Sequence, residues 1–261
     1  MTKALVLKAS PKKDGNTATM ADQFVAGLTA SGEATVHEFY LNDLSIRPCQ
    51  GCNACIRPPH SGCVIDDDFQ KIVPVFREAD LVVFAAPIYW WHLCAQLKTF
   101  IDRMHPVLTF DRDHCLPTKD LVLITAYFAE DPYGVQLAVK TLESISGWAG
   151  MSFDVVSFHA DRGHVRDDPA KLAEANDLGR SFAGRAKPEL PIACVVDGCG
   201  FKFRDIEHAA MHIVMAAGAP HLKWKAAHLS ALHDLCNTHQ LVDEVCSILR
   251  RLHAQEDSKL P

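Results

Sequence analysis

The chain has 261 residues, of which 48% are hydrophobic and 22% charged, and its formal net charge is -6. This composition supplies a packed core and argues against intrinsic disorder. The negative charge and the lack of Lys/Arg runs argue against a nucleic-acid partner. No apolar stretch reaches the length of a membrane span, and the N-terminus runs directly into a strand-like segment without a signal peptide. We therefore expect a cytoplasmic protein with no membrane partner.

Short apolar runs alternate with amphipathic segments along the first 186 residues. The apolar runs are typical of buried parallel strands, and the segments between them show helical spacing of apolar residues. Strands are predicted at 3–9, 34–40, 79–86, 120–126 and 153–158, and helices from 16 and at about 68–78, 94–105, 134–148 and 169–186. We therefore expect an α/β fold with a doubly wound, five-stranded parallel sheet, in which Pro87 ends the third strand.

The alternation stops near Pro188. Residues 1–187 are therefore expected to form one domain, and residues 188–261, with a Cys/His-rich turn and long helical stretches, a small and mainly helical C-terminal domain. Ligands of doubly wound sheets bind beyond the carboxyl ends of the strands. The functional residues are thus expected in the loops that follow the strands.

The loop after the first strand runs from Ser10 to Thr17 and opens a helix. Free N–H groups and the helix dipole favour an anion at such a position, and Gly15 permits a tight turn. The lysine of a Walker motif is missing at its required spacing. The pattern Ser-Pro-x-x-x-Gly-Asn-Thr resembles the phosphate loop of NADPH-dependent FMN reductases and other flavodoxin-like proteins. This resemblance implies FMN as the cofactor, with phosphate contacts from Ser10, Lys12, Gly15, Asn16, Thr17 and Ala18; the alternative is an ordinary capped turn.

Aromatic residues follow the third strand. A flat ring can bind to exposed aromatic side chains at the carboxyl end of a strand. The sequence Pro-x-Tyr-Trp is similar to the isoalloxazine loop of the same family, although these side chains could instead pack on a neighbour. The loop after the fourth strand is the expected third wall of the pocket. The predicted ring contacts are Pro87, Ile88, Tyr89, Trp90, Thr125, Tyr127 and Glu130.

Four of the ten cysteines form a C-x2-C-x2-C-x7-C pattern. Disulfides are a poor explanation for clustered cysteines in a reducing compartment, and four thiolates suit either an iron–sulfur cluster or tetrahedral zinc. The spacing resembles that of the iron–sulfur flavoproteins. The resemblance implies a four-iron four-sulfur (4Fe-4S) cluster that exchanges electrons with FMN; zinc or free thiols are the alternatives. The four predicted ligands are Cys49, Cys52, Cys55 and Cys63.

The C-terminal segment contains a C-x4-C turn followed by Phe203 in the position of a core residue. This arrangement resembles the first part of a two-Cys two-His zinc finger, but the usual second histidine of that motif is missing. The alternative is a core turn followed by an amphipathic helix. The predicted zinc ligands are Cys194, Cys199, His208 and His212, with His221 as a replacement.

The resemblances together imply an FMN-dependent oxidoreductase. Electrons would come from NAD(P)H or a reduced protein and pass to a small acceptor, with the cluster as a further carrier. No catalytic acid or base is identified, and a homodimer or homotetramer is expected. The alternatives are an electron-transfer carrier without its own substrate and a non-enzymatic, zinc-stabilised binding module on the same fold.

Overall fold

The computed structural model describes residues 1–56, 62–105, 107, 118–128, 133–187, 189–190, 192–200, 202–203, 206–215, 219–228, 242–243 and 245–251. The chain divides into two compact units. The first contains Met1–Ser146 and Met151–Lys187, and the second Gly147–Gly150 and Pro188–Pro261. Within the described residues, no helix combines the length and the apolar character that a membrane crossing requires.

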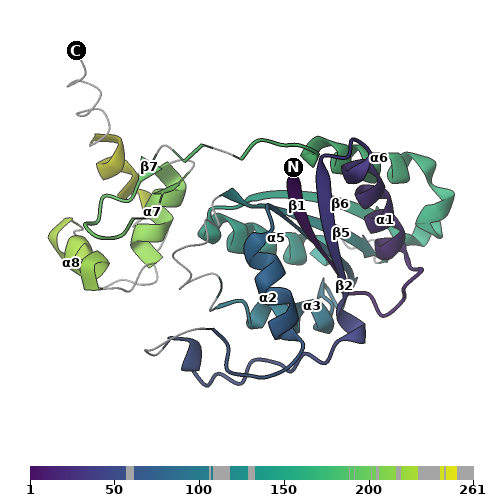
Figure 1. Ribbon diagram of the computed structural model, residues 1–261, viewed down its shortest axis with the longest axis horizontal. Coiled ribbons are helices and arrows are strands. Elements are labelled where there is room, and N and C mark those ends of the chain that lie inside the picture. Colours follow the sequence, from purple (N-terminus) through teal and green to yellow (C-terminus); the bar gives the residue numbers. More distant parts are fainter. Residues whose placement is uncertain are drawn as a thin grey trace, which may run out of the picture. The chain divides into compact units, whose positions relative to one another are not determined.

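The first unit is built on a parallel sheet with the strand order β2-β1-β3-β5-β6 (Figure 1). The predicted doubly wound, five-stranded parallel sheet is confirmed. The order reverses between β1 and β3, and such a switch point is the usual ligand position in this architecture. The parallel strands are β1 (Thr2–Lys8), β2 (Ala34–Tyr40), β3 (Leu81–Tyr89), β5 (Asp120–Tyr127) and β6 (Ser152–His159), and the short β4 (His92–Leu93) pairs antiparallel with β3.

Helices connect the strands. α6 begins where the sequence predicts, because the Asp168 carboxylate accepts a hydrogen bond from the Lys171 N–H and Pro169 occupies the first turn. It ends earlier than predicted, before Gly184 at φ +63°. The helices are α1 (Asn16–Thr29), α2 (Phe69–Glu78), α3 (Ala95–Asp102), α5 (Tyr133–Ala149) and α6 (Pro169–Phe182), with single 3-10 turns η1 (Leu41–Asp43), η2 (Ala54–Ile56), η4 (Ala160–Arg162) and η5 (Val165–Asp167).

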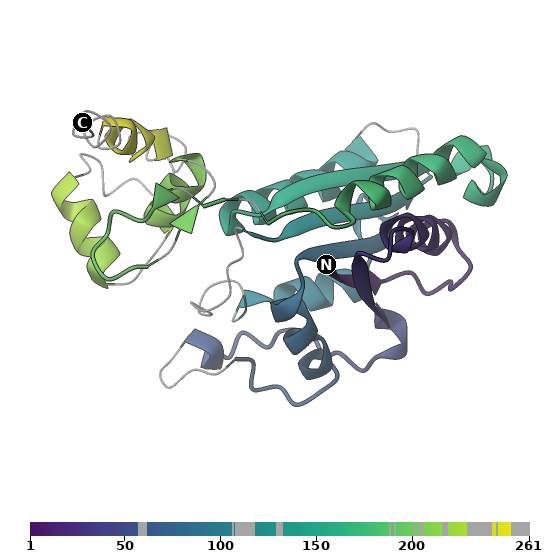
Figure 2. The same ribbon diagram turned by 45° about the horizontal axis from the view of Figure 1, so that its top comes forward.

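Both faces of the sheet are covered. Figures 1 and 2 show α1 and α6 side by side on one face, where Phe24 of α1 and Phe182 of α6 join a core with alternate strand residues such as Val83. On the opposite face, Phe84 of β3 meets Phe100 of α3, with ring centroids 6.3 Å apart. Burial on both faces explains why the central strands read as continuous apolar runs.

The prediction that Pro87 ends the third strand is wrong. β3 continues to Tyr89, with Pro87 opposite Ala126 of β5. On its other side, the β1–β3 ladder reaches only Ala85, which accepts a hydrogen bond from the Ala9 N–H. The missing N–H of Pro87 therefore costs no ladder hydrogen bond on that side. The last residues of β3 are held instead by the antiparallel hairpin to β4.

Two glycines set the close approach of α1 and α6. A Cβ atom on Gly179 would lie 2.0 Å from the Phe24 carbonyl oxygen, and one on Gly27 would lie 2.0 Å from the Asn176 carbonyl oxygen. Gly179→Ala is therefore expected to lower the free energy of unfolding by about 1–3 kcal/mol or more, because backbone must move. Urea unfolding measures this change. Gly147→Ala in α5 is the matched control: its Cβ would meet nothing within 4 Å, so no loss is expected, and equal losses would contradict the account.

The second unit begins with a small antiparallel hairpin, β7 (Ile192–Ala193) and β8 (Lys202–Phe203), followed by α7 (Ile206–Met215) and α8 (Ala219–His228). The hairpin was not among the expected elements. Phe203 is buried, as expected, in a core of Val196, Phe203, Ala209, Ala210, Ile213, Val245, Cys246 and Leu249. This core gives the second unit its own packed centre.

Candidate functional site

The loop between β1 and α1 forms a tight turn at the carboxyl edge of the sheet. The Gly15 N–H donates to the Lys12 carbonyl, and the Lys12 N–H donates to the buried Ser10 hydroxyl oxygen. A Cβ on Gly15 would approach the Cβ of Lys12 to 3.2 Å, so the turn has little room for a side chain there. Thr17 and Ala18 are buried, so the first turn of α1 presents backbone N–H groups rather than these side chains.

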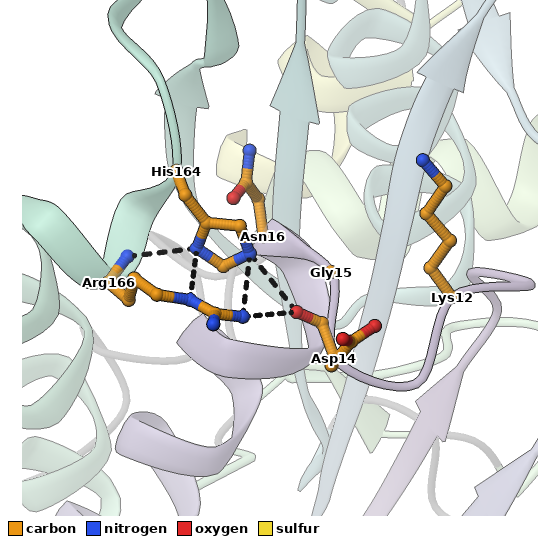
Figure 3. Close-up of a pocket in the computed structure, with 6 residues that line it drawn as sticks. All are labelled: Lys12, Asp14, Gly15, Asn16, His164 and Arg166. Carbon is orange, nitrogen blue, oxygen red and sulfur yellow. Dashed lines mark hydrogen bonds between the residues drawn. The ribbon is translucent and has the colours of Figure 1, made fainter.

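A cavity of about 400 Å³ lies against this loop (Figure 3). The turn after β6 contributes two of its lining residues and also holds the loop in place. The Val165 N–H donates to the side-chain oxygen of Asn16, and the Arg166 Nη2 donates to the Asp14 carbonyl oxygen. The complete lining is Lys12, Asp14, Gly15, Asn16, His164 and Arg166.

His164 and Arg166 were missed by sequence reasoning. They lie about 150 residues from the loop that they contact, and no short motif joins them to it. The available signal was topological: the segment that carries these two residues follows the fifth parallel strand, at the same edge of the sheet as the loop after the first.

The β3–β4 hairpin presents aromatic side chains to solvent. Trp90 and Trp91 form its turn, with φ of 49° and 62°, in the left-handed region that bulky residues rarely adopt. Tyr89 is 46% exposed and Trp90 88% exposed. The predicted ring contacts Pro87, Ile88, Tyr89 and Trp90 therefore lie at the end of β3, one strand away from the loop after β1.

The predicted third wall is only partly available. The Thr125 side chain is fully buried, and its hydroxyl donates to the Ala86 carbonyl oxygen, so it joins β5 to β3. Tyr127 stacks on His159 of β6, with ring centroids 4.9 Å apart. The predicted contact Glu130 lies outside the described residues. Of the three contacts predicted for this wall, Tyr127 is thus the one whose described side chain reaches the edge of the sheet.

The four cysteines lie in one long loop between β2 and α2. Cys49 and Cys52 are exposed, whereas Cys55 and Cys63 are partly covered. Burial raises the pKa of the Cys55 thiol, and repulsion from the thiolates of Cys63, Cys52 and Cys49 adds to the rise. The donor set suits a metal or cluster chemically, but no three described His, Cys, Asp or Glu side chains converge on one point. Binding would therefore require the loop to draw the sulfurs together.

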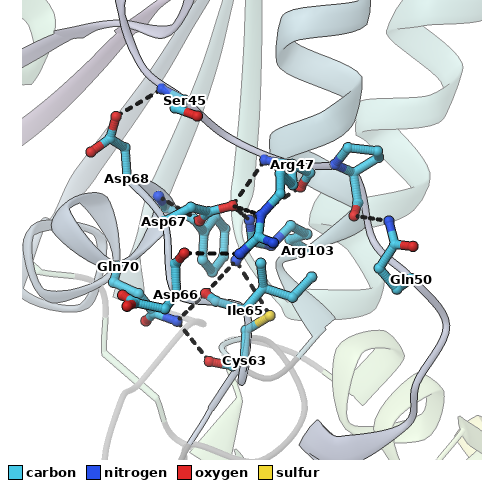
Figure 4. A network of polar contacts seen from close by, with 12 residues as sticks. Ser45, Arg47, Gln50, Cys63, Ile65, Asp66, Asp67, Asp68, Gln70 and Arg103 are labelled. Atoms are coloured by element: carbon cyan, nitrogen blue, oxygen red, sulfur yellow. Dashed lines mark hydrogen bonds and ion pairs between the residues drawn. The ribbon is translucent and has the colours of Figure 1, made fainter.

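A buried arginine connects the two ends of this cysteine loop (Figure 4). The side chain of Arg103, just after α3, is 0% exposed and forms an ion pair of 2.5 Å with Asp67. Its guanidinium also donates to the carbonyl oxygens of Arg47 and Ile65, on the two sides of the loop, and to the Cys63 sulfur at 3.4 Å. One buried cation therefore joins both ends of the loop and lies next to one of the four thiols.

In the second unit, Cys194 and Cys199 flank the β7–β8 turn and are close enough to interact. Burial raises the pKa of the Cys194 thiol, and the neighbouring Cys199 adds to this rise. The backbones of His208 and His212 lie in α7 and that of His221 in α8. The side chains of these three histidines are not among the described ones, so the zinc set stays a prediction.

Comparison with known proteins agrees with the observed architecture. The family described as having a flavodoxin-like fold matches residues 2–180. An iron-sulfur flavoprotein of Methanosarcina thermophila is 29% identical over 193 residues, covering 70% of this chain and 91% of that protein. An iron-sulfur flavoprotein of Archaeoglobus fulgidus is 36% identical over 104 residues, covering 40% of this chain and 46% of that protein, so this match spans less than half of the relative.

Solved structures support the same fold. An azoreductase from Bacillus anthracis str. Sterne superimposes with a TM-score of 0.56 at 23% identity, covering 70% of this chain and 100% of that one. An FMN-dependent NADH-azoreductase from Bacillus anthracis str. Ames Ancestor, solved in complex with FMN, gives 0.55 at 14% identity with the same coverage. The sheet order and the match over most of the first unit lead to one conclusion: the chain belongs to the family of proteins with a flavodoxin-like fold.

Proposed function

We propose that this protein is an FMN-dependent oxidoreductase that accepts electrons from a nicotinamide nucleotide or a reduced carrier and passes them to a small acceptor. The observation that carries the proposal is the shared position of two loops. The tight turn after β1, with its cavity, and the aromatic turn after β3 follow neighbouring parallel strands at the switch point. A ligand that carries both a phosphate and a flat ring suits this pair: the phosphate fits the turn after β1, and the ring fits the aromatic turn after β3.

The residues present fit FMN. The turn at Gly15 is too tight for a Cβ, and the start of α1 provides N–H groups for the phosphate. In this proposal Ser10, Lys12, Gly15, Asn16, Thr17 and Ala18 hold the phosphate, and Tyr89 and Trp90 border the ring with Pro87, Ile88 and Tyr127. The flavin supplies the two-electron chemistry, and the chain orients it and shields one side from water. FMN-dependent or FMN-containing relatives support this assignment.

The cysteine loop extends the proposal. We infer that Cys49, Cys52, Cys55 and Cys63 bind a four-iron four-sulfur cluster. Several relatives named iron-sulfur flavoprotein support an iron–sulfur centre, and four thiolates suit the four-iron type. Four thiols in one loop form a suitable donor set, and the Arg103 cation offsets negative charge at Cys63. In the second unit, Cys194 and Cys199 with the histidines of α7 are proposed to bind zinc, and the molecule to assemble as a homodimer or homotetramer.

An anaerobic absorption spectrum of the purified protein, with flavin, iron and zinc content per chain, tests these assignments together. One FMN per chain is expected, released by denaturation and reduced when NADH or NADPH is added. Iron with acid-labile sulfide supports the cluster, whereas zinc without iron replaces it with a zinc site. A colourless protein that also fails to take up added FMN would disprove the main proposal.

Replacing Trp90 with asparagine separates binding from folding. Asparagine tolerates a positive φ, so the free energy of unfolding is expected to rise by about 1 kcal/mol. FMN affinity is expected to fall about tenfold, since stacking or edge contact with an aromatic ring is lost. Urea unfolding of the apoprotein and flavin fluorescence titration measure the two effects. Trp90→Tyr, which keeps an aromatic ring, should retain most of the affinity; equal FMN binding by Trp90→Asn would exclude Trp90 from the ring site.

A further inference from the structure

The turn after β6 contacts the loop after β1 through the side chains of His164 and Arg166. His164 Nε2 lies 3.1 Å from the Asp14 carbonyl oxygen, and Arg166 Nη2 donates to the same oxygen at 3.1 Å (Figure 3). His164 Nδ1 accepts hydrogen bonds from the N–H and the Nε of Arg166. Arg166 Nη2 also lies 3.1 Å from His164 Nε2, so the guanidinium contacts both ring nitrogens of the imidazole.

These contacts fix the direction of one peptide group in the loop. The Asp14 carbonyl points at His164 and Arg166, while the N–H of the same peptide, on Gly15, donates to the Lys12 carbonyl. A carbonyl oxygen facing a bound phosphate would repel it. The hydrogen bond from Arg166, with the His164 ring beside it, therefore satisfies this oxygen within the protein.

The cavity beside this peptide has an excess of positive charge. Lys12 and Arg166 line it from opposite sides of the loop, as Figure 3 shows, and Asp14 supplies the opposing carboxylate. Among the described residues, neither Lys12 nor Arg166 forms an ion pair. The Nη1 group of Arg166 takes part in no hydrogen bond within the same part of the chain. Hydrogen bonds at Nε and Nη2 thus position the guanidinium, and its Nη1 group remains available to donate to a ligand.

We propose that Arg166, positioned by His164, binds the phosphate monoester of the flavin together with the loop after β1. The inference rests on the proposed FMN site and adds to it a contact from the turn after β6. A guanidinium suits a phosphate dianion because it offers several N–H donors in one plane. The flavin phosphate is favoured over the 2′-phosphate of NADPH because the loop after β1, through Lys12, Asp14, Gly15 and Asn16, forms most of the cavity lining.

Affinities for FMN and riboflavin distinguish a phosphate contact from a structural role, because riboflavin has the same ring without the phosphate. For Arg166→Gln, the dissociation constant for FMN is expected to rise about tenfold or more, as for the loss of one charge-assisted hydrogen bond. The dissociation constant for riboflavin should stay within about twofold. Arg166→Lys should recover part of the FMN affinity. The matched control is Arg180→Gln on α6, where the arginine Nε donates to Asn176 away from the cavity.

Three other results are informative. If the wild-type protein binds neither flavin, the proposed function and this inference both fail. If it binds FMN and Arg166→Gln binds FMN equally well, or weakens FMN and riboflavin alike, only the phosphate contact is disproved. If Arg166→Gln instead reduces the preference for NADPH over NADH at unchanged FMN affinity, the assignment to the flavin phosphate is overturned in favour of the nicotinamide nucleotide.

Discussion

Replacing Arg103 with glutamine is expected to lower the free energy of unfolding by about 3–5 kcal/mol, since it leaves the Asp67 carboxylate buried without its cation. The two side chains are 0% and 5% exposed, so solvent cannot compensate. The same change removes the hydrogen bonds to the Arg47 and Ile65 carbonyl oxygens, which join the two ends of the cysteine loop. Urea unfolding measures the stability, and limited proteolysis within 47–67 reports opening of the loop.

The pH dependence of the free energy of unfolding tests whether the Asp67 carboxylate is the partner of Arg103. Burial alone would raise the pKa of Asp67, but the hydrogen bond from Arg103 and the N–H groups of Arg47 and Phe69 outweigh it and lower the pKa. A lowered pKa stabilises the folded protein above the ordinary carboxyl pKa of about 3.9, and this contribution is lost as the pH falls toward the lowered value. The stability difference between wild type and Asp67→Asn should therefore be full at pH 7 and shrink below about pH 4.

Double substitution supplies the control. Arg103→Gln and Asp67→Asn together should cost less than the sum of the two single changes, because no unpaired charge remains in the double variant. Arg103→Lys keeps the charge but not the planar set of donors, so an intermediate loss is expected. Additive single effects would show that the pair does not act as a unit.

Local patterns in the sequence are sufficient to predict most of the first unit. The five apolar runs coincide with the five parallel strands, and the cap formed by Asp168 and Pro169 marks the start of α6. Patterns fail where a neighbour in space overrides a local rule. Pro87 was expected to end a strand, but β1 has already ended beside it. The rule against proline in a strand assumes a ladder on both sides, and local sequence does not reveal where a ladder ends.

Short motifs indicate the loops of the candidate site but not the residues that reach those loops from distant segments. The loops beginning at Ser10 and Pro87 can be recognised from short motifs at the ends of strands. Arg166 meets the first loop only through the order of strands in the sheet. Arg103 is part of an amphipathic segment, and nothing in its periodicity shows that Asp67 and two carbonyl groups would bury it. Such residues depend on tertiary contacts that helical or strand spacing does not encode.

Replacing Cys52 with serine is expected to remove essentially all bound iron while leaving the FMN content unchanged. A serine hydroxyl stays protonated near neutral pH and is a poor ligand for iron–sulfur clusters, which are held by thiolates. Because Cys52 is exposed, the change removes no core packing, so a loss of iron cannot be attributed to unfolding. Iron and acid-labile sulfide per chain, with flavin released by denaturation, are the measurements.

The same substitution at Cys94 provides the control. Cys94 is buried outside the cysteine loop, and its thiol donates to the Ala9 carbonyl oxygen, a bond that a serine hydroxyl can also form. Cys94→Ser should therefore keep its iron. Retention of iron by Cys52→Ser would exclude Cys52 as a ligand, and loss of zinc in place of iron would identify a zinc site. Since the four sulfurs do not converge in the structure, a protease-sensitive loop in Cys52→Ser and a resistant one in wild type would show that the bound metal draws the loop together.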